Sequence, residues 1–201
     1  MAEIIVVGPN DAFLVIDMNS DFLNPTGKLF VRGITGEPGP EELVKRILWL
    51  NNLPFGYRIM VSEMHSPDHL EFIHYPIHAI KDTGGQRWPE ELLEMYDKAD
   101  FRLVKGMEPE IMSAPIYAGK DFFQLIRSLR AADIKRIFIA GLAYDQCLGE
   151  AAIALSHQHF EAIIVRNATR SVPPPRGRVE TMKQILRLYG IKEVKSSCFR
   201  F

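Results

Sequence analysis

The feature that most constrains the fold of this chain is a regular alternation of short apolar runs with amphipathic helical segments. Segments of strand length, most of them apolar, cover residues 12–17, 57–62, 101–104, 136–140, 162–165 and 192–194. Near-continuous apolar character is typical of parallel strands that are covered on both faces. Apolar residues at helical spacing predict helices between these runs, at residues 41–51, 120–132 and 178–189. Strands that alternate with helices predict an α/β fold with a parallel sheet and right-handed crossovers.

Composition limits both the organisation and the partners of the chain. Its 201 residues, 47% hydrophobic and 24% charged, suit one compact domain over residues 1–201, and no linker or internal repeat divides it. A net charge of -1 without basic runs argues against nucleic acid and anionic membranes, so we expect a small-molecule substrate. Only two cysteines, no targeting signal and no apolar run of membrane-spanning length favour a cytoplasmic protein.

Chemically reactive side chains follow four of the predicted strands directly. Asp17, the pair Glu63 and His65, Lys105 and the turn that contains Cys147 each come at a strand end. Because open α/β sheets bind ligands outside the carboxyl ends of their strands, we expect these groups to gather on one edge of the sheet.

Cys147 follows an apolar run that ends at Gly141, in a turn where Asp145 could cap a new helix. This places the thiol in the first helical turn, where free N–H groups and the helix dipole favour a thiolate. The alternative is a small buried thiol that only packs.

A cysteine nucleophile needs a base, a positive charge and donors for the oxyanion. Asp17 can be the base if burial raises its pKa, and Lys105 can supply the charge. The N–H groups of Ala143 and Cys147 can form the oxyanion hole. Alternatively, Asp17 is a capping carboxylate and Lys105 a solvated charge.

A possible metal site comes from the histidine-rich stretch after the second strand. Glu63, His65 and His78 offer one carboxylate and two imidazoles, a set suited to zinc, iron or manganese. The alternative is a polar loop whose histidines bond one another or solvent. Phe22 and Tyr75 can likewise belong to the core or stack on a flat substrate.

These residues together resemble the nicotinamidase and isochorismatase-like cysteine hydrolases. The resemblance extends over nearly the whole chain and rests on these segments: residues 17–22, 63–69, 75–85, Lys105-Gly106 and 141–147. It implies a doubly wound, mostly parallel sheet of about six strands with helices on both faces, the isochorismatase-like hydrolase fold.

By this resemblance Asp17, Lys105 and Cys147 would be the catalytic triad of an amidohydrolase that works through a thioester. The substrate would be nicotinamide, which is hydrolysed to nicotinate and ammonia. A divalent metal, zinc before iron or manganese, would lie on Glu63, His65 and His78 and bind the pyridine nitrogen. The remaining implied features are a cis peptide at Leu142–Ala143, a homo-oligomer, and a substrate site that contains Phe22, Tyr75 and Leu142.

Three departures from the family pattern bear on the metal and the substrate. Glu63 stands where nicotinamidases have Asp, Tyr75 replaces the usual Trp, and Lys81-Asp82 replaces the usual Gln-Gly. The fourth metal ligand could be His69, His74 or water. Two other functions therefore stay open: a metal-independent amidohydrolase for an N-carbamoyl or maleamate-like substrate, and a non-catalytic binding protein.

Overall fold

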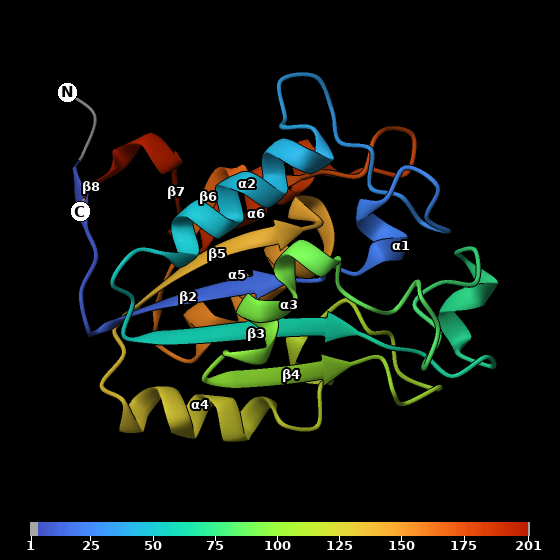
Figure 1. Cartoon of the computed structure of the whole chain (residues 1–201), viewed down its shortest axis with the longest axis horizontal. Coiled ribbons are helices and arrows are strands. Elements are labelled where there is room, and N and C mark those ends of the chain that lie inside the picture. The colour runs from blue at the N-terminus through green and yellow to red at the C-terminus, as the bar shows by residue number, and fades with distance from the viewer. Residues whose placement is uncertain (1–3, 201) are drawn as a thin grey trace.

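The computed structural model describes residues 4–200, whose main feature is a six-stranded parallel sheet (Figure 1). The strand order is β4-β3-β2-β5-β6-β7, and every neighbouring pair is parallel. The strands are β2 (Asp11–Ile16), β3 (Tyr57–Glu63), β4 (Phe101–Lys105), β5 (Arg136–Leu142), β6 (Glu161–Arg170) and β7 (Lys192–Val194). Successive strands move outward in one direction from β2 and in the other from β5, so the topological switch point lies between β2 and β5.

Helices cover both faces of the sheet, as the sequence predicted. One core packs α2 (Pro40–Asn51) and α3 (Glu90–Asp97) against Phe13 and Val15 of β2. The other packs three helices against Ala12, Leu14 and Ile16 of the same strand: α4 (Phe122–Ala131), α5 (Gly149–His157) and α6 (Val179–Leu188). Alternate residues of β2 therefore enter two different cores, which explains why the strand is apolar without interruption.

The structure adds elements that the sequence did not predict. The segment between β3 and β4 contains α3. A separate two-stranded parallel sheet joins β1 (Ile5–Val6) to β8 (Phe199–Arg200). Strand β6 also extends beyond its expected end at residue 165. The short elements are α1 (Ser20–Leu23), η1 (Leu70–Ile73), η2 (Ile116–Ala118), η3 (Tyr144–Leu148) and η4 (Ser196–Cys198). Among residues 4–200, no helix is long and apolar enough to cross a membrane.

Candidate active site

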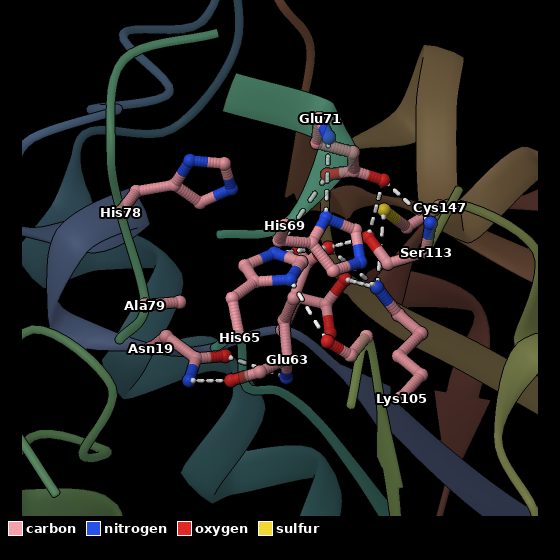
Figure 2. A network of polar contacts seen from close by, with 12 residues as sticks. Asn19, Glu63, His65, His69, Glu71, His78, Ala79, Lys105, Ser113 and Cys147 are labelled. Carbon is pink, nitrogen blue, oxygen red and sulfur yellow. Dashed lines mark hydrogen bonds and ion pairs between the residues drawn. The ribbon is translucent and has the colours of Figure 1, made fainter. Parts of the chain in front are cut away.

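Three reactive side chains from separate segments meet next to the switch point of the sheet. Asp17 directly follows β2 with a φ of 52°, a left-handed conformation that aspartate tolerates better than most residues. Lys105 is the last residue of β4, and its Nζ lies 2.8 Å from Asp17 Oδ2 and 3.5 Å from Cys147 Sγ. Figure 2 shows the Lys105 ammonium directed at the Cys147 sulfur. The structure thus brings together the acid, amine and thiol that the sequence placed at one edge.

Burial dominates the electrostatics of this group. It raises the pKa of Asp17 to about 7, with Lys105 opposing the shift and the Glu63 carboxylate adding to it. Burial also raises the pKa of the Cys147 thiol well above its usual value, and here the Lys105 cation opposes the carboxylates of Asp17 and Glu63. Burial and the two carboxylates therefore oppose the thiolate that the sequence favoured. Burial acts to lower the pKa of Lys105, but the surrounding anions raise it far above its usual range, so Lys105 stays charged.

The turn before α5 differs from the predicted helix start. Residues Tyr144–Leu148 form a π-helical turn with a kink at Gln146, and α5 begins only at Gly149, so Cys147 precedes the helix. The buried Asp145 caps no helix. Its carboxylate accepts hydrogen bonds from the N–H groups of Val172 at 2.8 Å and Arg178 at 2.7 Å. This side chain therefore fixes the loop between β6 and α6 beside the cysteine turn.

The peptide bond Leu142–Ala143 is cis, which confirms the prediction made from the sequence. It lies directly after β5, at the start of the cysteine turn.

A cavity of about 410 Å³ opens over these groups. That volume falls in the range of small-molecule sites, roughly 300–1,000 Å³. Every substrate-site and oxyanion-hole residue that the sequence predicted lines it: Phe22, Tyr75, Leu142, Ala143 and Cys147. Three arginines, Arg32, Arg176 and Arg178, also line it, and no sequence motif had pointed to them.

A buried group of potential metal ligands lies beside the cavity. Glu63, His65, Glu71 and His78 each present a donor atom, and these atoms lie within 4.8 Å of one another (Figure 2). Glu71 is the fourth potential ligand in this group, whereas the sequence analysis named His69, His74 or water. His69 instead uses its Nδ1 to accept from the Glu71 N–H at 3.2 Å, and His74 is exposed. The available signal for Glu71 was an acidic residue inside a histidine-rich stretch.

The chemistry of this group fits a divalent metal. His65 Nδ1 lies 3.0 Å from Gly106 O and His78 Nδ1 lies 2.7 Å from Pro76 O, so both Nδ1 atoms are donors and both Nε2 atoms are free to accept. His65 Nε2 is buried and makes no hydrogen bond, although Glu63 Oε1 lies 3.2 Å away. Two imidazoles and two carboxylates in a buried pocket suit zinc and related ions.

Gly106 makes the position of His65 possible. Its φ is +82°, and a Cβ at this residue would lie 2.7 Å from the Cε1 atom of His65. A side chain there would displace the imidazole, so glycine is required on both conformational and steric grounds.

Glu63 connects the metal-ligand group to the acid, amine and thiol. Its carboxylate, Asp17 and Cys147 also lie within 4.8 Å of one another, but this second set is no metal site because the Lys105 ammonium occupies its centre. Lys105 Nζ lies 3.4 Å from Glu63 Oε1. Burial acts to raise the pKa of Glu63, but the Lys105 ammonium holds it well below its usual value. One ionised carboxylate therefore faces both clusters.

Comparison with known proteins agrees with this geometry. No protein-family model matches the chain. The nicotinamidase of Saccharomyces cerevisiae is 21% identical in an alignment of 224 residues that covers 90% of this chain and 97% of that protein. The crystal structure of PnC1 from L. infantum in complex with nicotinate gives a TM-score of 0.86 at 23% identity, covering 98% of each chain. Pyrazinamidase of Pyrococcus horikoshii in complex with zinc gives 0.72 at 22% identity, covering 93% of this chain and 99% of that one.

These similarities confirm the resemblance to nicotinamidases that the sequence motifs indicated, and they confirm the predicted fold.

Proposed function

We propose that this protein is an amidohydrolase that converts nicotinamide to nicotinate and ammonia. Its similarity to the yeast nicotinamidase extends over 90% of the chain, and a protein of the same fold is known in complex with nicotinate. The cavity is large enough for a pyridine ring and is lined by a thiol and a carboxylate, both of which contact the buried Lys105 ammonium. This combination supports a hydrolase over a non-catalytic binding protein.

In the first half of the proposed reaction, Cys147 attacks the carboxamide carbon while Asp17 takes the thiol proton. The thiol holds its proton at neutral pH, so a base is required, and an aspartate with a pKa of about 7 is matched to this task. The carbonyl oxygen becomes an oxyanion, which the N–H groups of Ala143 and Cys147 would stabilise. Asp17 then returns the proton to the amide nitrogen, the C–N bond breaks, and ammonia leaves a thioester on Cys147.

In the second half, water attacks the thioester while Asp17 accepts a proton from it. The second tetrahedral oxyanion collapses, the C–S bond breaks, and the acid is released as Cys147 regains its proton. Lys105 would remain charged throughout and offset the negative charge that the carboxylates and the developing oxyanion place in the buried site.

Substrate orientation would come from the cavity wall and the metal-ligand group. Phe22 and Tyr75 line the cavity and can flank the ring. Glu63, His65, Glu71 and His78 would hold a divalent metal, with zinc favoured because a pyrazinamidase of this fold is known in complex with zinc. When bound, such an ion is a Lewis acid that can ligate a pyridine nitrogen.

The observation that carries the proposal is that Asp17 and Cys147 line one cavity and that the buried Lys105 ammonium contacts both of them. The test is release of ammonia from nicotinamide and pyrazinamide by purified protein supplied with Zn²⁺, Fe²⁺ or Mn²⁺. Cys147→Ala should abolish release, and Cys198→Ala, at the other free cysteine, should not. Absence of ammonia release with every metal would refute the proposal.

The arginines of the cavity favour a second candidate, an amide that carries an anionic group. Arg32, Arg176 and Arg178 line the cavity, and guanidinium groups bind carboxylates in a bidentate manner. An N-carbamoyl amino acid or a maleamate-like amide would use the same thiol chemistry. A higher kcat/KM for such an amide than for nicotinamide, lost in Arg176→Ala, would favour this candidate.

The predicted cytoplasmic location and homo-oligomeric state belong to the same proposal. Light scattering of the purified protein tests the second of them.

A further inference from the structure

Ser113 is a buried residue in the segment between β4 and η2 that neither the triad nor the metal-ligand group includes. Ser113 is buried, and together with its neighbours Met112 and Ala114 it lines the cavity. Figure 2 shows its hydroxyl among the carboxylates of Glu63 and Glu71. The serine side chain carries no charge, so an ion pair does not account for its burial.

The contacts of Ser113 are all directed at potential metal ligands. Its Oγ lies 2.7 Å from Glu71 Oε1 and also contacts Glu63 Oε1. Its main-chain N–H donates to Glu71 Oε1 at 2.5 Å. A hydroxyl has one proton to donate, so with the N–H group Ser113 can give one hydrogen bond to each carboxylate.

These hydrogen bonds matter because the two carboxylates are buried side by side. Glu63 and Glu71 have oxygen atoms within 4.8 Å of each other, a distance at which two negative charges repel strongly away from water. Glu63 is also held by the Lys105 ammonium at 3.4 Å. Glu71 has a weaker hold, because among the described residues its carboxylate accepts hydrogen bonds from Ser113 alone and contacts no lysine or arginine.

We propose that Ser113 is a positioning residue that holds Glu63 and Glu71 together as a preformed pair of metal ligands. It acts through these carboxylates and not on the substrate. Because the adjacent residues form the cavity wall, Ser113 also attaches that wall to the ligand group. The inference rests on the metal-binding part of the proposed function.

The test is the Zn²⁺ affinity of metal-free protein, measured by competition with a chromophoric chelator. Loss of a partner that orients metal ligands typically costs about 10–100-fold in affinity, and we expect a loss in this range for Ser113→Ala. Ser113→Thr keeps the hydroxyl and should recover most of the affinity.

Ser171→Ala is a matched control. Ser171 is buried, and it likewise donates from both its Oγ, at 2.6 Å, and its N–H, at 2.8 Å, to one carboxylate, that of Glu37, outside the ligand group. We expect this variant to lose stability and to keep wild-type Zn²⁺ affinity. Circular dichroism with EDTA present verifies that each variant is folded.

A double-mutant cycle with Glu71→Gln keeps the proposal testable, and if Ser113→Ala folds poorly, Ser113→Gly, which also removes the hydroxyl, replaces it in the cycle. If Ser113 acts through Glu71, the double variant loses less affinity than the two single losses combined. Wild-type affinity in Ser113→Ala, or full additivity in the cycle, would overturn the inference while leaving the proposed function intact. Absence of Zn²⁺ binding by the wild-type protein would overturn the metal site itself, and ammonia release would then be judged separately.

Discussion

Replacement of Lys105 by methionine should destabilise the protein in a pH-dependent manner. The ammonium lies 2.8 Å from Asp17 and 3.4 Å from Glu63, and it is almost fully buried. At 2.8 Å and an effective dielectric constant of about 20, one such pair is attracted by about 6 kcal/mol. Removing one partner of a buried pair costs about 3–5 kcal/mol, because the remaining charge is left uncompensated. For a chain of this length that corresponds to a melting temperature lower by roughly 6–20 °C.

The pH dependence follows from Asp17. Its pKa is about 7 in the folded wild-type protein against an ordinary 3.8, and loss of Lys105 removes an influence that lowers it. A raised folded-state pKa stabilises the protein below the unfolded value, and this stability is lost as the pH rises through the folded value. Both proteins lose stability in parallel up to about pH 7. Above it only the variant continues to lose stability, so its deficit grows.

Urea unfolding of both proteins between pH 5 and pH 9 measures this deficit. Lys98→Met is the control, since Lys98 pairs with Glu94 at 2.7 Å on the exposed surface and should have no measurable effect. A Lys105→Met protein as stable as the wild type at pH 9, or a deficit that does not change with pH, would refute the electrostatic reasoning.

Two further predictions test the base and the packing of the site. The kcat/KM for nicotinamide should rise about tenfold per pH unit up to about pH 7 and then level off, because only ionised Asp17 accepts the thiol proton. Initial rates from pH 5 to pH 9 measure this profile, and a kcat/KM that does not change with pH contradicts the prediction. Gly106→Ala should cost about 1–3 kcal/mol of overpacking in urea unfolding and weaken Zn²⁺ binding, because its Cβ meets His65. Gly36→Ala controls for the cost of a positive φ in alanine, since Gly36 has a φ of +88° but no atom lies within 4 Å of an added Cβ. Equal losses of stability in both variants would exclude the clash with His65 as the cause.

The sheet was predictable because its strands are buried on both sides. Residues such as Phe13 and Leu14 enter opposite cores, so the strand is apolar throughout and stands out from the amphipathic helices around it. The pairing of β1 with β8 was not predictable. It joins two residues at each end of the chain, and no local pattern encodes a contact between segments so distant in sequence.

The residues of the candidate site also fall into those that the sequence could predict and those that it could not. Asp17 and Lys105 could be predicted because strand ends locate them, whatever path the loops take. Glu71 and Ser113 lie in segments without apolar periodicity, where the sequence gives no backbone path and so no direction for a side chain. The surroundings of Cys147 were not predictable for a related reason: the sequence favoured a thiolate at a helix start, but it does not show the burial and the nearby carboxylates that raise the pKa of the thiol.

Because Glu63 faces both the metal-ligand group and Lys105, a bound cation should change the chemistry of the thiol. The Glu63 carboxylate is one of the groups that raise the pKa of Cys147, and a divalent ion beside Glu63 would offset its charge. We therefore expect alkylation of Cys147 by iodoacetamide to reach its half-maximal rate at a lower pH with Zn²⁺ than with EDTA, while Cys198 serves as the internal control. Mass spectrometry of the labelled peptides measures both sites in one sample. An unchanged midpoint for Cys147 in protein that has bound Zn²⁺ would show that Glu63 does not couple the two clusters.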